Sequence, residues 1–404
     1  MLYEVNRHEA LSSSSWDAAK AHEYIERVTT DTELRFSREE YWPIHPLDEE
    51  QPPGTKVHSM YMGTAGVIWG LDYLIRAGAI NGRVDFGGIV PELIAATRSR
   101  LEARAAAGVQ QGYDGLLGAS AGQLLVAARL EGLSTTADKI GAAVDANWDN
   151  PVREYMFGSP GTAMLSLALF NETGDEVWAS RFRRDVSRLW ETLEPCQGAD
   201  CLIWEQDLQG QKATHMGAVH GFAGNVLPAL RGLNLLPDAE QKKWLDCIAR
   251  TLRATAIHDG ELVNWPQSVG KHRLGRTAPL VQHCHGAPGI VNCVADFPSS
   301  GIDDLLLAAG ETIWRAGPVR KGCCICHGTA GNGYAFLKLF KRTGDEKWLE
   351  RARRFAAHSI DQCEAAAQQF GQYRYSLWTG DIGLAIFLWG CINGDDRIPT
   401  QDIF

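Results

Sequence analysis

A short glycine step, Gly-x-x-Gly, recurs along this chain, and an apolar run follows each copy. Copies that retain both glycines begin at Gly63, Gly158, Gly221, Gly286, Gly328 and Gly380. A further copy, Ala119-Ser-Ala-Gly122, has lost its first glycine and brings the total to seven units. A small unit of this kind buries its apolar face only by stacking on its neighbours. The pattern therefore predicts a single repeat architecture.

Two of the units are internal duplicates. Residues 158–184 align with residues 328–354 without a gap, at an offset of 170 positions. Thirteen of the 27 aligned positions are identical. Equivalent positions in different units can therefore be compared directly.

Each unit predicts a pair of helices. The segment after the glycines, such as residues 162–170, is apolar nearly all round, which is typical of a helix buried on both sides. A Thr-Gly-Asp-Glu turn follows, and its acidic residues suit the start of a second helix. The next stretch, residues 177–193, is amphipathic and predicts an outer helix with one face in water. Further outer helices are expected over residues 90–107, 135–146, 239–256, 302–316 and 347–360.

The helix pairs predict an all-α fold, because persuasive alternating strand patterns are nearly absent. Seven pairs could stack as an open solenoid or close into a ring. Closure is favoured because it gives every inner helix two neighbours and places the glycines at one rim. Residues 1–57, with a helix expected over residues 16–28, are predicted to be an N-terminal arm that packs on the ring of residues 58–404.

Composition excludes several classes of protein. The chain has 404 residues, of which 45% are hydrophobic and 22% charged, as in a soluble globular protein. Its net charge of −10 opposes binding to a phosphate backbone, so nucleic acid is not an expected partner. The longest apolar stretch, residues 382–392, is shorter than the ~20 residues of a membrane-spanning helix. With no signal peptide at the N-terminus, we expect a cytoplasmic protein whose ten cysteines are thiols or metal ligands.

Chemistry is expected just before the glycine steps. The residue before the first glycine is a histidine in three consecutive units, namely His220, His285 and His327. One position earlier, two of these units have Cys284 and Cys326. The closely matching third unit has Met156-Phe157 there, so the helix hairpin itself does not require Cys-His. These residues are therefore candidates for a function at one rim of the ring.

Cys284, Cys326 and His327 would provide a Cys₂His set, which suits zinc with one open coordination position. The alternative is that they are buried thiols and a structural histidine. Cys323 and Cys324 lie so close to Cys326 in the sequence that spacing alone does not decide which of the three is the ligand. The equivalence of Cys284 and Cys326 within their units favours Cys326. A redox role for Cys323-x-x-Cys326 would be expected in a βαβ context, which this helical chain lacks.

Three stretches carry a resemblance to a known family: Gly217-Ala-Val-His220-Gly-Phe-Ala-Gly224, Cys284-His285-Gly-Ala-Pro-Gly289 and Gly322-Cys-Cys-Ile-Cys326-His327-Gly-Thr-Ala-Gly331. Together they resemble the lanthionine synthetase C-like family, and the resemblance covers essentially the whole chain. The Arg320-Lys321-Gly322 segment and the Phe387-Leu388 closing helix look closer to stand-alone, eukaryotic-type members than to peptide-antibiotic cyclases. The resemblance implies an α/α toroid of seven inner and seven outer helices, with one zinc ion held by Cys284, Cys326 and His327.

The resemblance also implies a reaction, the Michael-type addition of a thiol to dehydroalanine or dehydrobutyrine that gives a thioether. Stand-alone members are associated with glutathione, so the expected partners are glutathione or a peptide cysteine and a peptide or protein that contains a dehydroamino acid. By the same resemblance His220 transfers the proton, and Glu154 orients the imidazole or relays a proton. Lys321 and the adjacent Arg320 are expected to bind the substrate.

Two other readings remain open at the level of sequence. One is a non-catalytic adaptor or signalling protein that binds zinc and glutathione. The other is a different zinc-thiolate alkyl transferase, such as a protein prenyl transferase, although the Cys-His-Gly repeats do not resemble that class. An α/α-toroid glycosidase would need paired carboxylates in the cavity, whereas the rim offers cysteine and histidine. The chain has no room for a dehydratase domain, so the dehydroamino acid is expected to be made elsewhere.

Overall fold

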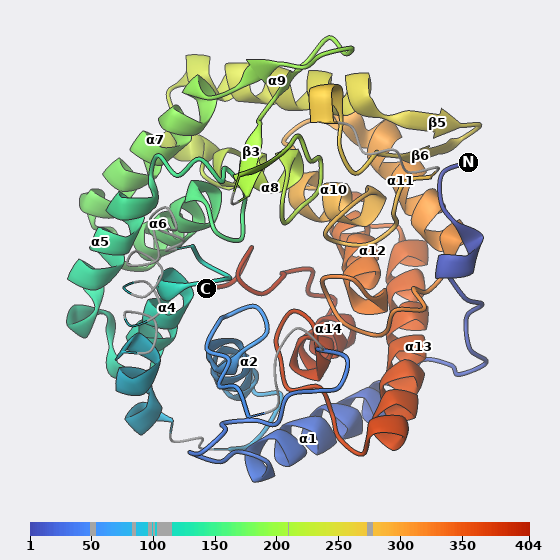
Figure 1. Cartoon of the computed structure of the whole chain (residues 1–404). Helices are drawn as coiled ribbons and strands as arrows, with labels where there is room; N and C mark the ends of the chain where they lie inside the picture. Colours follow the sequence, from blue (N-terminus) through green and yellow to red (C-terminus); the bar gives the residue numbers. More distant parts are fainter. Residues whose placement is uncertain are drawn as a thin grey trace.

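The computed structural model describes residues 1–48, 54–82, 86–95, 99, 102, 115–208, 210–272 and 278–404. Two concentric layers of helices surround a common centre, and Figure 1 looks down the axis of the resulting ring. The fold is therefore the predicted all-α toroid.

Inner helices line the centre, and each begins directly after the first residue of one glycine step. They are α2 (Thr64–Arg76), α4 (Ser120–Glu131), α6 (Ser159–Thr173), α8 (Phe222–Arg231), α10 (Ala287–Val294), α12 (Thr329–Thr343) and α14 (Asp381–Asn393). The described residues thus contain one inner helix for each of the seven predicted units. Because α6, α10 and α14 are apolar on nearly every side, they are stable only between the outer layer and the centre.

Outer helices follow five of these inner helices. They are α5 (Ala137–Asn147), α7 (Glu176–Glu191), α9 (Asp238–Thr255), α11 (Asp303–Ala316) and α13 (Glu346–Phe370). Asp175 and Asp345 cap α7 and α13 by accepting backbone N–H groups, as the Thr-Gly-Asp-Glu turns predict. The outer helix expected over residues 90–107 falls largely outside the described residues. Helix α13 continues ten residues beyond its predicted end at residue 360, until Gly371 ends it at a φ of 71°.

No outer helix follows α14, and the N-terminal segment supplies one instead. Helix α1 (Ala18–Leu34) packs against α14 and α13 at the outside of the ring. Figure 1 shows it at the bottom of the view, beside the end of α13. Its buried face includes Tyr24, Ile25 and Val28.

The repeated loops are joined by a belt of backbone hydrogen bonds at the rim. Tyr61 N–H donates to Leu117, Leu117 to Met156, Tyr155 to Val219, Cys284 to Cys326, Cys326 to Trp378, and Trp378 back to Tyr61. Seven of these eight residues, all except Tyr155, occupy the position two before the first residue of the glycine step in their unit. The belt therefore places equivalent positions of neighbouring units side by side, and it closes the ring between the last unit and the first.

The second glycine of each step has a steric reason. A Cβ atom on Gly331 would overlap the carbonyl oxygen of Ile325, and one on Gly289 would overlap that of His283. The equivalent carbonyl, six residues earlier, blocks the second glycine of every other unit as well. The rim loop thus passes so close to the first turn of each inner helix that only glycine fits.

Strands are few and short among the described residues. Three antiparallel hairpins pair β1 (Glu194–Pro195) with β2 (Leu202–Ile203), β3 (Gln206–Leu208) with β4 (Gln211–Ala213), and β5 (Ile257–Asp259) with β6 (Leu262–Asn264). Short 3₁₀ helices are η1 (Val5–Arg7), η2 (Gly87–Ile89), η3 (Leu133–Thr135), η4 (Leu233–Leu235), η5 (Gly270–His272) and η6 (Ser300–Ile302). These elements lie in the connections and do not interrupt the helical ring.

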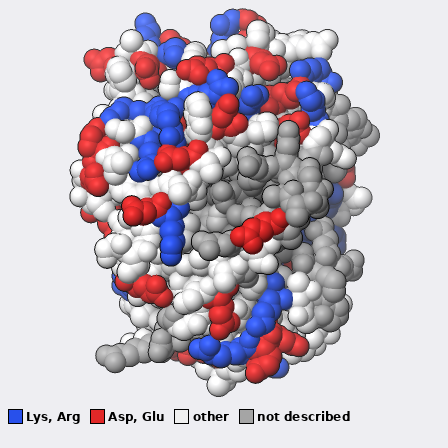
Figure 2. Space-filling view, turned by 60° about the vertical axis from the view of Figure 1, so that its left-hand side comes forward, with Lys and Arg blue, Asp and Glu red and all other residues white. Residues whose placement is uncertain are grey.

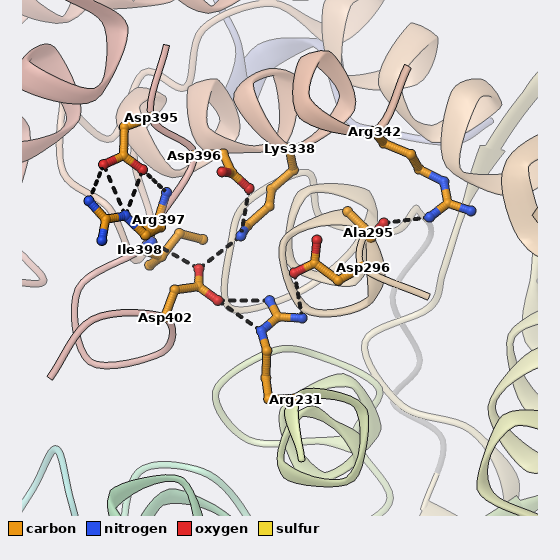
Figure 3. A network of polar contacts seen from close by, with 10 residues as sticks. All are labelled: Arg231, Ala295, Asp296, Lys338, Arg342, Asp395, Asp396, Arg397, Ile398 and Asp402. Atoms are coloured by element: carbon orange, nitrogen blue, oxygen red, sulfur yellow. Dashed lines mark hydrogen bonds and ion pairs between the residues drawn. The ribbon is translucent and has the colours of Figure 1, made fainter. Parts of the chain in front are cut away.

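The C-terminal segment returns to the middle of the ring, where Figure 1 places the chain end. Figure 3 shows how charges hold it there. Lys338 of α12 is only 2% exposed and lies 2.9 Å from both Asp396 and Asp402. Arg231 of α8 pairs with Asp402 at 2.8 Å and with Asp296 at 2.7 Å. Each buried cation therefore has two carboxylate partners, so none of these charges is buried alone.

The outer surface has mixed charge. On the face seen in Figure 2, lysines and arginines are interspersed with acidic side chains over the described atoms. Many arginines pair with carboxylates of a neighbouring helix, as Arg181 and Arg184 of α7 do with Asp145 of α5. Of the helices that the structure describes, none has the length and hydropathy needed to cross a membrane.

Candidate active site

Three of the sequence-predicted residues meet at the rim. The Sγ atoms of Cys284 and Cys326 and a ring nitrogen of His327 all lie within 4.8 Å of one another. The rim belt explains this proximity, because the backbone N–H of Cys284 donates to the carbonyl of Cys326 at 3.1 Å. His327 Nε2 is 3.6 Å from Cys326 Sγ. Two consecutive repeat loops therefore carry one cluster of potential metal ligands.

The surroundings of this cluster favour a thiolate at Cys284, whereas burial and the neighbouring Cys284 raise the pKa of Cys326. Both cysteines are buried, and Gln282 Nε2 lies 2.9 Å from Cys284 Sγ as a hydrogen-bond donor. Burial opposes ionisation, but hydrogen bonds from Cys326 and His327 and the nearby imidazoles lower the pKa of Cys284 well below its ordinary value. Two thiols and an imidazole at this separation are the donor set that zinc prefers. The residues present therefore fit a zinc ion.

A histidine and a buried carboxylate form a second functional pair. His220 Nδ1 lies 2.8 Å from Glu154 Oε2, and Glu154 is fully buried. The carboxylate is held by the backbone N–H groups of Met156 and Phe157, at 3.1 and 2.5 Å. Burial alone lowers the pKa of His220, but the hydrogen bond and charge of Glu154 outweigh it, so the pKa is raised. Because Nδ1 is engaged by Glu154, Nε2 is the nitrogen left to exchange a proton with a substrate.

One cavity connects these groups. Its volume is about 1130 Å³, and His220, His327, Lys321 and Cys324 all contribute to its lining. Further lining residues come from other repeat loops and from the N-terminal segment; they include Tyr61, Phe157, Arg374, Thr379 and Asp48. The histidine–carboxylate pair, a metal-ligand candidate and a cationic side chain therefore face one shared space large enough for a peptide-sized ligand.

Arg320 is placed differently from Lys321. Its Nε donates to the carbonyl of His8 at 2.8 Å, and its Nη1 lies 3.8 Å from Glu9. Arg320 is not among the described residues that line the cavity. Of the two adjacent cations, the structure thus directs Lys321 to the cavity and Arg320 to the N-terminal segment.

His285 has its nearest described polar partner outside the metal-ligand cluster. Its Nε2 lies 3.3 Å from Gln267 Nε2, and its ring is tilted by 59° to that of His215, with 5.4 Å between the ring centroids. Burial lowers the pKa of His285 to about 4. His285 therefore has a neutral imidazole whose polar contact lies outside the metal-ligand cluster.

Sequence reasoning did not single out some residues of the site. Gln282, which donates to Cys284, and Arg374, which lines the cavity, have no repeat signature that identifies them. Tyr61 did carry a signal, because it occupies in the first unit the position of Cys284 and Cys326. The repeat comparison therefore finds residues at the rim positions and misses those around them.

Comparisons with known proteins identify the family of this chain. The model of the family described as lanthionine synthetase C-like protein matches residues 109–403. The chain belongs to this family. As a lanthionine synthetase C-like protein it is similar to "Glutathione S-transferase LANCL1" of Danio rerio, with 38% identity over 120 residues. It is also similar to "LanC-like protein GCL1" of Arabidopsis thaliana, with 36% identity over 150 residues.

These similarities cover only parts of the relatives. The first alignment spans 27% of this chain and 28% of the Danio rerio protein. The second spans 35% of this chain and 33% of the Arabidopsis thaliana protein. Among solved structures, nisin cyclase has a TM-score of 0.54 over 93% of this chain and 98% of that chain, at 13% sequence identity. The likeness to nisin cyclase supports the helical toroid fold.

Proposed function

We propose that this protein forms a carbon–sulfur bond by adding a thiol to a dehydroamino acid in a peptide or protein. The thiol substrate is glutathione or a peptide cysteine. The observation that carries the proposal is the shared cavity, which brings the His220–Glu154 pair, His327 of the Cys284–Cys326–His327 cluster and Lys321 around one space. Membership of the lanthionine synthetase C-like family supports the same reaction class.

Cys284, Cys326 and His327 would hold zinc. When bound, zinc supplies deprotonation of the substrate thiol, whose ordinary pKa is ~8.5. The protein's contribution at this point is to keep the ligands buried and oriented. Gln282 does so at Cys284, where it donates a hydrogen bond to the sulfur.

His220 supplies the proton that the reaction needs. The new S–C bond forms at the β-carbon while the C=C π bond breaks, and the α-carbon then takes up one proton. His220 carries that proton because its pKa is raised, and Glu154 holds the ring so that Nε2 faces the cavity. The thiol's own proton is released to solvent, and His220 takes up one proton from solvent afterwards, so that each turnover adds one thiol across the double bond and restores the imidazolium.

Lys321 provides positive charge on the cavity wall. Its position suits a carboxylate of glutathione, or the oxygen of the enolate that forms when the sulfur adds. The printed name of the Danio rerio relative, a glutathione S-transferase, supports glutathione as the thiol. Glutathione is therefore the first substrate to test.

The test is to incubate the purified full chain with glutathione and a peptide that contains dehydroalanine, and to follow thioether formation by mass spectrometry. The proposal predicts enzyme-dependent addition of one glutathione per dehydroalanine. His220→Ala is expected to lower kcat ~10²–10⁴-fold, because a positioned general acid contributes that much. His22→Ala, on the outer helix α1, is the matched control and should leave the rate unchanged.

An adaptor function gives a different result in the same experiment. If calorimetry detects glutathione binding while no peptide product forms above the uncatalysed rate, the protein binds the thiol without using it. That outcome would contradict the catalytic proposal.

A further inference from the structure

A second cluster of potential metal ligands lies outside the cavity. Cys323 precedes α12, Cys363 lies within α13, and Asp381 is the first residue of α14. The Sγ atoms of Cys323 and Cys363 and a carboxylate oxygen of Asp381 all lie within 4.8 Å of one another. Segments far apart in the sequence thus place two thiols and a carboxylate together.

We propose that Cys323, Cys363 and Asp381 form a second site for a soft divalent cation of the zinc class. Two sulfurs and one oxygen are ligands that zinc accepts, whereas magnesium and calcium prefer oxygen alone. The site is independent of the proposed catalytic function, because none of its residues belongs to the Cys284–Cys326–His327 cluster.

The repeats provide an internal control for this cluster. The position of Asp381, directly after the first glycine of the unit, is uncharged in every other unit: Thr64, Ser120, Ser159, Phe222, Ala287 and Thr329. The residue equivalent to Cys323 in the duplicated third unit is Arg153. The helix hairpin therefore requires neither a carboxylate nor a thiol at these places.

Asp381 is a buried carboxylate that forms no ion pair with a basic side chain among the described residues. It is 5% exposed, and burial raises its pKa. Arg374 donates only its backbone N–H to Asp381 Oδ2, at 2.6 Å, and uses its guanidinium for Asp48. Within the described parts of the chain, no ion pair includes Asp381. Buried carboxylates are normally paired with a cation or coordinate a metal, and a bound divalent ion would meet that need.

Neighbouring groups orient the three side chains. Cys323 Sγ is 3.3 Å from Asp381 Oδ1, and the hydroxyl of Tyr24, on helix α1, donates to Cys363 Sγ. The first contact lies within the triad, whereas the Tyr24 hydroxyl lies outside it and is the kind of donor that supports a metal ligand. Cys323 remains partly exposed, so a cation can reach the cluster from solvent.

A cation bound at this second site would stabilise the fold around the rim loop. Cys323 stands three residues before Cys326, and the other ligands come from α13 and α14. The bound ion would therefore fasten the loop that carries Cys326 and His327 to two helices, and through Tyr24 to α1. The expected role is structural, holding the rim loop in place.

The test is zinc content by elemental analysis of the full chain, after dialysis against a mild chelator. We expect about two zinc ions per chain in the wild type and about one in Cys363→Ala. Asp381→Asn is the second variant, since it keeps the volume of the side chain and is expected to weaken zinc retention 10- to 100-fold. Cys391→Ala, a buried cysteine of α14 outside both clusters, is the matched control and should retain both ions.

Two results would overturn the second site. The first is about one zinc ion in the wild type, lost in Cys284→Ala and unchanged in both Cys363→Ala and Asp381→Asn. The second is a Cys323–Cys363 disulfide in the purified protein, seen as a mass lower by two hydrogens. Conversely, loss of one ion in Cys363→Ala with none lost in Cys284→Ala would support the second site and contradict the proposed catalytic one.

Discussion

At the scale of residues, the central pair is Glu154 and His220. A fully buried carboxylate with two backbone N–H partners cannot turn away from the imidazole, so the ring is fixed and its pKa is raised. Glu154 is a positioning residue, since it reaches the substrate only through His220. Glu154 therefore determines which ring nitrogen of His220 faces the substrate, and it favours the protonated form of that ring.

Replacing Glu154 by glutamine should reveal this coupling. Glu154→Gln removes the negative charge while burial of His220 remains, so the pKa of His220 should fall below that of the wild type. Since the protonated imidazole is the active form, activity falls as the pH rises through the pKa of His220. In Glu154→Gln this fall should occur at a lower pH than in the wild type. The measurement is kcat against pH for thioether formation.

KM for glutathione serves as the internal reference for that experiment. It should change little, because Glu154 is buried behind His220. An unchanged alkaline limb in Glu154→Gln would contradict the assigned role of the pair.

The repeats explain how much of the site the sequence could predict. Cys284, Cys326 and His327 stood out because equivalent units lack them, and the rim belt brings these positions together. Gln282 and Arg374 were not predictable, because their contacts depend on how one loop faces another. The Cys323–Cys363–Asp381 cluster was missed for the same reason, since Cys363 lies on an outer helix without a repeat signature.

At the scale of elements, the second glycine of each unit determines how closely a rim loop approaches its helix. Gly331→Ala would place a methyl group against the carbonyl of Ile325 and the Cβ of His283. Overpacking of this kind costs ~1–3 kcal/mol. We expect the free energy of unfolding to fall by about that amount, as measured by urea denaturation.

Gly82→Ala is the matched control for that substitution. Its Cβ would meet its nearest neighbour, Glu33 Oε1, at 3.4 Å, which is ordinary contact. Equal stability of Gly331→Ala and Gly82→Ala would contradict the steric reason given for the repeated glycine.

Helix positions were predictable wherever a glycine or an aspartate marks the start of a helix. The glycine steps mark the inner helices, although these begin inside the step and not after it, so that α6 starts at Ser159 and not at the predicted residue 162. Helices α7 and α13 begin directly after their capping aspartates. The end of α13 was predicted too early, because residues 361–370 carry no breaker before Gly371. That α1 takes an outer position beside α14 depends on ring closure, which no local pattern encodes.

At the scale of the whole molecule, the ring is secured from two directions. The belt of backbone hydrogen bonds joins the rim loops, and the C-terminal segment is held in the centre by Lys338 and Arg231. Family membership and the toroid fold agree with this closed form.

Lys338 is the residue whose loss should loosen the centre most. Lys338→Met leaves Asp396 and Asp402 buried with one cation fewer, and breaking such a pair costs ~3–5 kcal/mol. Lys341→Met, an exposed lysine one helical turn away on α12, should change stability by less than ~0.5 kcal/mol. Thermal and urea unfolding of both variants provide the comparison, and equal effects would show that the buried network is not what holds the C-terminal segment.

The proposed activity requires the Cys284–Cys326–His327 cluster to be both a zinc site and part of the catalytic cavity. The most direct measurement is zinc content and glutathione addition in the same preparations of wild type, Cys326→Ala and Cys391→Ala. We predict that Cys326→Ala loses about one zinc ion per chain and all thioether formation, while Cys391→Ala retains both. Full activity of Cys326→Ala, or zinc content equal to that of the wild type, would contradict the account.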